Sequence, residues 1–171
     1  MAAPVKIAVQ DANILIDLEL AGLFDLWFQA GIETHTTDLI RAELENGQHE
    51  QALGYFKSKH IREHRLAYEE LQEVARVERE VGNKAKFNDC SVLYLAEKID
   101  AMMLSGDKAL RNAGKARQIE VHGTLWIFDL LIEKGLLSGK VAAAKLDSLI
   151  RNDRHLPRAE CEQRFRKWRT G

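Results

Sequence analysis

Residues 101–107, Ala-Met-Met-Leu-Ser-Gly-Asp, are the stretch that decides the fold class. The four apolar residues are too few for a helix and are followed by Ser105 and Gly106, a pattern typical of a fully buried strand in a parallel sheet. Asp107 comes directly after this strand. Because the ligand crevice of an open parallel sheet lies outside the carboxyl ends of its strands, we expect Asp107 at a functional site.

The N-terminal region shows the same succession of strand, aspartate and helix. Residues 5–10 have the short alternating pattern of a strand, and Asp11 ends the run. From Asn13 through Phe28 the apolar residues recur at helical spacing. Asp11 is therefore predicted to lie where a strand passes into a helix.

The rest of the chain continues to alternate between strand and helix patterns. We predict further strands at 32–35, 60–65, 101–104 and 118–121, and helices that begin near residues 38, 49, 68, 88, 108, 124, 138 and 157. This order predicts an α/β fold of three layers, in which helices flank a predominantly parallel central sheet. At 171 residues, 46% of them hydrophobic, the chain fits one domain with a real core.

Composition argues against several classes of protein. No apolar stretch approaches the ~20 residues of a membrane helix, and the first residues lack the pattern of a secretory signal, so we expect a cytoplasmic protein. Cys90 and Cys161 have no CxxC partner and no ordered histidines, which argues against a zinc site or a disulfide framework. The net charge of -1 argues against a protein that coats nucleic acid by bulk electrostatics.

The charge is distributed unevenly along the chain. Residues 151–171 contain seven basic and three acidic residues, a net charge of +4, so residues 1–150 carry a net charge of -5. Such a basic segment is suited to hold a polyanion beside a cation-binding site, and it is equally typical of a solvated helix face.

Four acidic residues are the candidates for chemistry. Asp11 and Asp107 end strands, Asp89 opens a helix, and Glu43 lies about two turns into the helix that follows Thr36 and Thr37. If the four converge, their mutual repulsion raises their pKa values unless a cation joins them. A carboxylate cluster without cysteine or histidine indicates Mg²⁺ or Mn²⁺, which would lower the pKa of a bound water and neutralise charge on a scissile phosphodiester.

The segments around these acids resemble the motifs of PIN-domain nucleases. They are residues 9–17 with Asp11, Thr36 and Thr37 with Glu43, residues 88–96 with Asp89, and residues 104–110 with Asp107. The four acids follow the order of that family. Residues 122–137 are similar to one bacterial branch of it, and the whole resembles VapC-like toxin ribonucleases and related stand-alone PIN proteins.

The resemblance implies a Rossmann-like PIN domain over residues 1–137, a divalent metal ion at the four acids, and endoribonuclease activity on RNA. It also implies, as for many bacterial members, the toxin half of a toxin-antitoxin pair with an antitoxin protein as partner. Residues 138–171 would form a basic helical extension, packed on or continuous with the same domain. This extension makes the chain longer than many such toxins, which weakens the toxin role more than the nuclease role.

Four further residues have both a functional and a structural interpretation. Asn13 would orient a bound water or cap the helix after Asp11, and Thr124 would bind an acidic side chain or only cap a helix. Lys108 and Arg111 would contact RNA phosphates or belong to the ordinary charged surface.

Other residues are assigned to structure or weighed against the four acids. Glu45 competes with Glu43, and Asp17 is expected to face away from Asp11. The aromatic side chains of Trp27 and Trp126 are expected in the core rather than as platforms for bases. His60 and His64 have the i, i+4 spacing of a metal pair, but no HExxH glutamate accompanies them, so we reject a zinc protease.

The sequence is also compatible with two other functions and with a homodimer. The first alternative is a non-catalytic regulatory or RNA-binding module with the PIN shape. The second is an aspartyl phosphatase or receiver-like phosphoacceptor, although such a phosphatase would have an aspartate where this chain has Asn13. Leu23, Phe24 and Trp27 would form either the face of a homodimer or part of the core.

Overall fold

The structure is a computed structural model that describes residues 4–170. A five-stranded sheet lies at its centre, and all its strands are parallel, in the order β3-β2-β1-β4-β5. The strands are β1 (Lys6–Gln10), β2 (Ile32–Thr37), β3 (Ile61–His64), β4 (Met102–Leu104) and β5 (Val121–His122). In the central strand, Val9 pairs with His35 of β2 on one side and with Met103 of β4 on the other.

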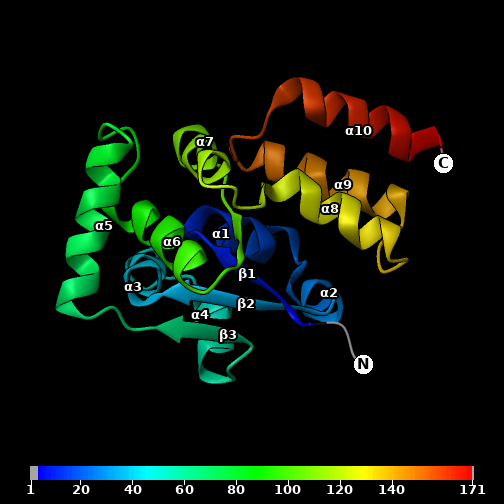
Figure 1. Cartoon of the computed structure of the whole chain (residues 1–171). Coiled ribbons are helices and arrows are strands. Elements are labelled where there is room, and N and C mark those ends of the chain that lie inside the picture. The colour runs from blue at the N-terminus through cyan, green and yellow to red at the C-terminus, as the bar shows by residue number, and fades with distance from the viewer. Residues whose placement is uncertain (1–3, 171) are drawn as a thin grey trace.

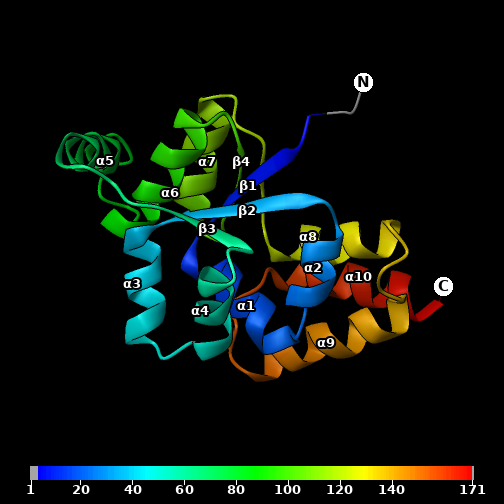
Figure 2. The same cartoon turned by 90° about the horizontal axis from the view of Figure 1, so that it is seen from below.

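Helices cover both faces of this sheet (Figure 1 and Figure 2). One face carries α5 (Tyr68–Glu80), α6 (Phe87–Lys98) and α7 (Lys108–Ala116). The other carries α1 (Ala12–Ala21), α2 (Phe24–Gln29), α3 (Asp38–Asn46), α4 (Glu50–Lys57), α8 (Thr124–Glu133), α9 (Gly139–Arg151) and α10 (Arg158–Thr170). The predicted three-layer α/β fold is confirmed.

The helical pattern from Asn13 through Phe28 forms two helices instead of one. Gly22 ends α1 with φ 63° and ψ 41°, a left-handed conformation that glycine adopts without steric cost. Its backbone N–H donates to the carbonyl of Glu19, so the last turn of α1 is closed in the usual way for a helix C-terminus. The chain changes direction there before α2 begins at Phe24.

Several predicted boundaries differ from the structure by a few residues, among them three near the predicted acids and Thr124. The last strand, predicted at 118–121, lies at Val121–His122, because Gln118 adopts φ 60° in the turn that ends α7. The strand predicted at 32–35 continues to Thr37, whose side chain still caps the next helix. The helix of Asp89 begins one residue earlier than predicted, at Phe87, so this aspartate lies inside its first turn.

The predicted dimer face belongs to the core. Leu23, Phe24 and Trp27 are 0%, 1% and 0% exposed, so they cannot form a surface for a second copy. The indole N–H of Trp27 donates to Thr34 Oγ1 at 2.7 Å, which satisfies its one polar group inside the core. A homodimer would therefore need another surface.

The C-terminal helices pack on the domain that precedes them. In Figure 1, α8, α9 and α10 lie side by side, and α9 contacts α1 while α10 contacts α9. Arg164 of α10 donates hydrogen bonds to both carboxylate oxygens of Asp129 in α8, and Cys161 and Trp168 are buried. Both cysteines are free. The boundary at residue 137 itself stays a prediction.

Within residues 4–170, none of the helices combines the length and the apolar character that crossing a bilayer requires.

The α9–α10 packing leaves no room at Gly139. A Cβ added there would lie 2.9 Å from the backbone oxygen of Trp168, so Gly139→Ala should lower the free energy of unfolding by about 1–3 kcal/mol. Gly54→Ala is the matched control, since nothing lies within 4 Å of its added Cβ inside α4, and it should stabilise by about 0.5–1 kcal/mol. Urea denaturation measures both, and an unchanged midpoint for Gly139→Ala would contradict this packing.

Candidate active site

Asp11 lies at the carboxyl end of β1, where the chain turns into α1. Its carboxylate is 1% exposed and accepts two hydrogen bonds, from the Ile14 backbone N–H at 2.9 Å and from the Ser105 hydroxyl at 2.6 Å. The first of these caps α1, as a helix N-terminus requires. Burial nevertheless raises the pKa of Asp11 to about 7, with smaller contributions from the charges of Asp89 and Asp17.

Asp107 occupies the equivalent position after β4. It caps α7 by accepting a hydrogen bond from the Leu110 backbone N–H at 2.7 Å, and it is half-buried. Its own backbone N–H donates to the Ser105 Oγ at 3.1 Å, and the same hydroxyl donates to Asp11. Ser105 thus connects the two strand-end aspartates. Sequence reasoning treated it only as the end of a strand.

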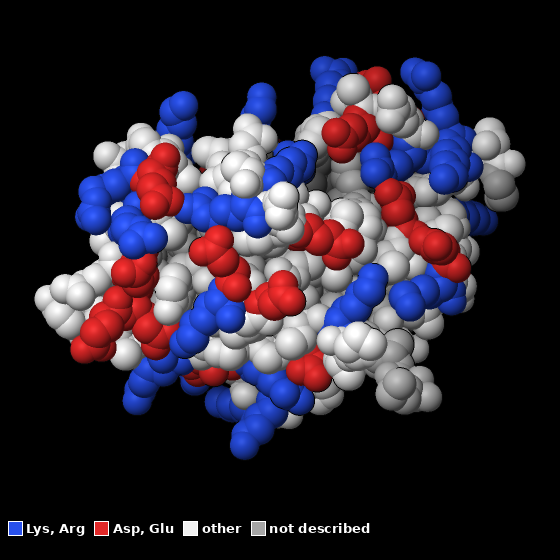
Figure 3. Space-filling model, in the orientation of Figure 1, with Lys and Arg blue, Asp and Glu red and all other residues white. Residues whose placement is uncertain are grey.

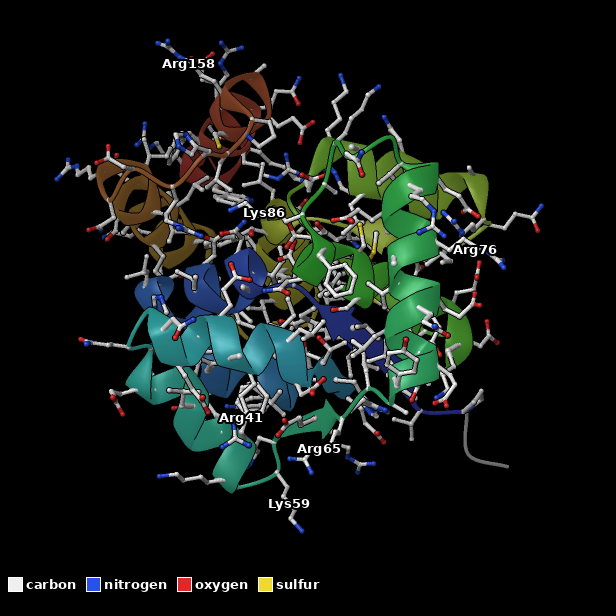
Figure 4. The ribbon with its side chains drawn as sticks, turned by 90° about the vertical axis from the view of Figure 1, so that its left-hand side faces the viewer. Arg41, Lys59, Arg65, Arg76, Lys86 and Arg158 are labelled. Atoms are coloured by element: carbon white, nitrogen blue, oxygen red, sulfur yellow. The ribbon has the colours of Figure 1, made fainter. Side chains whose placement is uncertain are left out.

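Asp89 stands opposite the ends of β1 and β4, on the first turn of α6. Burial raises its pKa to about 6, and the next contributions come from the charges of Glu43 and Asp107. Lys86, at the start of the same helix, lowers the pKa by its charge and by a backbone hydrogen bond. In the view of Figure 4, Lys86 lies near the centre of the molecule, whereas Arg76, Lys59 and Arg158 point outward from its edges.

Glu43 reaches this group of acids from α3. Its side chain is half-buried and raises the pKa of Asp89, while its rival Glu45 is exposed and pairs with Arg41 at 3.1 Å. The start of α3 is fixed against α6 by a 2.8 Å hydrogen bond between the buried hydroxyls of Thr37 and Ser91. The geometry therefore favours Glu43 over Glu45.

The four predicted acids interact electrostatically without forming a closed set of ligands. Asp89 interacts with each of the other three, as the pKa shifts of Asp11 and Asp89 indicate. Among residues 4–170, however, no three Asp, Glu, His or Cys side chains lie close enough to hold one ion. The acids share one region of the molecule, and their oxygens are still apart.

A cavity of about 470 Å³ opens beside these acids (Figure 3). Asp89 and Asp107 line it, together with three of the predicted neighbours, Asn13, Arg111 and Thr124. In Figure 3 the surface is hollowed there, with basic and acidic side chains at its margin. Asp11 and Glu43 do not line the cavity. Lys108 is exposed and lines a separate, more open groove beside α5.

Asp17 also lines this cavity, contrary to the prediction that it faces elsewhere. It lies one helical turn after Asn13, so the i, i+4 spacing already indicated a shared face. Its carboxylate accepts hydrogen bonds from Thr124 Oγ1 and from Arg154 Nε, both at 2.6 Å. Arg154 also donates to the Asn13 backbone and side-chain oxygens at 3.3 Å. Thr124 therefore binds an acid, although that acid is none of the four.

An aromatic pair completes the wall of the cavity. The rings of His122 and Trp126 stack with centroids 4.0 Å apart and planes 9° from parallel, and both side chains line the cavity. Trp126 packs against the core as predicted, but its side chain is only half-buried and also lines the cavity. Trp27 is buried as predicted.

Arg111 lies close to this pair. Its Nη1 lies 3.6 Å from the point where a side chain on Gly123 would begin, an ordinary van der Waals distance that places the guanidinium beside the β5–α8 turn. Within residues 4–170, Arg111 forms no ion pair, unlike Arg154 with Asp17 and Arg164 with Asp129. It therefore presents an unneutralised positive charge to the cavity.

Comparison with known proteins identifies the family. A family model described as a PIN domain, DUF3368, matches residues 7–170, and no curated protein matches the chain. A similar solved structure is the crystal structure of PAE2754 from Pyrobaculum aerophilum, with a TM-score of 0.55 and 20% sequence identity. The similarity covers 73% of this chain and 96% of that one, and at this identity it shows a shared fold. Since the family match extends over nearly the whole chain, this protein belongs to the PIN-domain family, whose fold is generally that of metal-dependent nucleases.

Proposed function

We propose that this PIN protein is a metal-dependent endoribonuclease that hydrolyses RNA phosphodiester bonds at Asp11, Glu43, Asp89 and Asp107. The observation behind the proposal is that burial, together with the charges of neighbouring carboxylates, raises the pKa of Asp89 to about 6 and that of Asp11 to about 7. Asp11 and Asp107 lie at the carboxyl ends of two adjacent strands, and Asp107 and Asp89 line the open cavity beside them. That edge of a parallel sheet is where ligands bind.

The donor chemistry of these residues fits a hard divalent cation. All four side chains offer oxygen, the ligand that Mg²⁺ and Mn²⁺ prefer, and repulsion among them is the penalty that such an ion removes. Each Asp11 oxygen accepts one hydrogen bond and keeps a lone pair for a ligand. Since no three acids are yet close enough to share an ion, binding would draw them together.

When bound, the ion would polarise the phosphate and lower the pKa of an attacking water. The chain supplies position. Asp89 and Asp107 face the cavity, and Arg111 offers a free guanidinium to a phosphate oxygen. Thr124 and Arg154 hold Asp17 from two sides, which keeps the wall of the cavity in place next to Asn13.

One observation favours the alternative of a non-catalytic RNA-binding module. The acids do not form a ligand set as they stand, and a regulatory protein would have no need of one. The two functions differ in what a divalent ion does, so activity with and without the ion separates them. An antitoxin partner is supported by the resemblance to toxin ribonucleases alone.

Replacing Asp107 tests the activity directly. Asparagine keeps the helix cap and removes the charge, so Asp107→Asn should fold normally and lose at least about a hundredfold in the rate of RNA cleavage. Cleavage of a mixed-sequence RNA is measured with Mg²⁺, with Mn²⁺ and with EDTA. Asp147→Asn on the surface of α9 is the control and should cleave like the native chain. Full activity in Asp107→Asn, or cleavage that persists in EDTA, would remove the proposed mechanism.

The stability of the metal-free protein gives a readout that does not depend on activity. Because the pKa of Asp11 is higher in the folded chain than the usual 3.8, the folded state binds a proton at Asp11 more tightly than the unfolded state does. The stability that this proton contributes is fully present below pH 4 and is lost as the pH rises through about 7.

Asp11→Asn should therefore be more stable than the native chain at pH 8 in EDTA, by about 1–3 kcal/mol, with little difference at pH 4. The amide can still accept the Ile14 N–H and donate to the Ser105 oxygen, so the cap and the link to β4 survive. Added Mn²⁺ should stabilise the native chain and so reduce the difference in stability between Asp11→Asn and the native chain. Denaturation at both pH values measures this, and a native chain that Mn²⁺ leaves unchanged would count against the cation site.

A further inference from the structure

We propose that the stacked rings of His122 and Trp126 form a platform on which one unpaired base of the RNA stacks. This inference deepens the proposed function and rests on it. It concerns how RNA is bound, which can be measured separately from how RNA is cut.

The aromatic pair lies in the same cavity as two of the proposed catalytic acids. His122 is the last residue of β5 and Trp126 lies in the first turn of α8, and the cavity that they line also contains Asp89 and Asp107. A volume of about 470 Å³ falls within the range of small-molecule sites and is ample for one nucleotide. A base bound there would be held within the same enclosure as the acids.

The exposure of Trp126 is unusual for this chain. Of its three tryptophans, Trp27 is 0% exposed and Trp168 is 4% exposed, and both belong to the core. Trp126 is half-buried, packs against the core and stacks its ring on that of His122 at the cavity. Aromatic and histidine rings are the surfaces on which proteins stack unpaired bases.

The charges around the pair suit the rest of a nucleotide. Arg111 has no acidic partner among residues 4–170, and its side chain lies beside Gly123, which stands between His122 and Trp126 in the sequence. Its backbone N–H donates to the Asp107 carbonyl at the start of α7. The cavity therefore offers rings for a base, a guanidinium for a phosphate and carboxylates for the reacting bond. This arrangement indicates a nucleotide as the ligand.

A duplex cannot use this platform. Both faces of a paired base are covered by its neighbours in the helix, so only an unpaired or extruded base can stack on a protein ring. The cavity is lined on several sides, by α1, α7, α8 and the loop before α10, which excludes a flat approach by a double helix.

The test compares two substitutions of Trp126 in the full chain, made in the Asp107→Asn background so that RNA stays intact. Trp126→Leu keeps apolar bulk and removes the ring, and Trp126→Phe keeps a ring. Binding of a fluorescent single-stranded RNA should weaken about ten- to a hundredfold for Leu and less than about fivefold for Phe. Tyr68→Leu, which removes an exposed aromatic residue far from the cavity at the start of α5, is the matched control and should bind normally.

A second measurement needs no substitution at the platform. Since Trp27 and Trp168 are buried, adenosine monophosphate should quench the tryptophan fluorescence of the native chain through Trp126, and Trp126→Phe should abolish this response. The same RNA annealed to its complement should compete at least about tenfold less well than the single strand.

The outcomes separate the platform from the nuclease. Equal binding of single-stranded RNA by the Asp107→Asn chain with and without Trp126→Leu, or no quenching of the native chain by the nucleotide, would overturn the platform even if the native chain cleaves RNA normally. A loss of binding in Trp126→Leu that Trp126→Phe shares equally, with a lowered melting temperature in both, would make the stack a structural brace and would also overturn it. Ring-dependent binding in a chain that never cleaves RNA would support the platform and defeat the proposed nuclease.

Discussion

The hydrogen bonds around Ser105 are the constraint on which the candidate site depends. The Asp11 backbone N–H donates to the Leu104 carbonyl at 3.1 Å, so the ends of β1 and β4 are paired up to the point where both strands stop. The Ser105 hydroxyl then donates to Asp11 and accepts from the Asp107 N–H. Two aspartates 96 positions apart in the sequence are thereby fixed to one atom.

This constraint has an energetic cost that shapes the rest of the region. A carboxylate that is 1% exposed has lost its hydration, and two hydrogen bonds do not restore its ordinary pKa. Neighbouring charges do not neutralise it either, because those that act on its pKa belong to Asp89 and Asp17 and are also negative. The fold thus maintains an acidic group that is poorly solvated and poorly paired, which is typical of a functional site and unusual for a purely structural one.

The sequence predicted the order of strands and helices because each element has a short-range signal. The signals near Asp11 and Asp107 are local. A short apolar run predicts a strand, and the aspartate that follows it caps the next helix. Contacts between distant parts of the chain have no such signal. Arg154 and Asp17 are 137 positions apart, and Trp126 lines a cavity together with residues 154–157, so neither feature could be predicted from local pattern. Local pattern likewise indicates only that Ser105 ends a strand, because its contact with Asp11 joins distant parts of the chain.

The C-terminal segment is therefore part of the cavity. Arg154, His155 and Glu160 form one side of it, opposite Asp107 and Arg111. Arg154 contacts both Asp17 and Asn13 in α1, and α10 is tied to α8 through Arg164 and Asp129. If the chain ended at residue 137, the acids would remain at the sheet edge, but the aromatic pair would face open solvent. Part of the basic charge of this segment therefore has a structural role. Arg154 pairs with Asp17 and Arg164 pairs with Asp129, and these ion pairs stabilise the wall against which a nucleotide would bind.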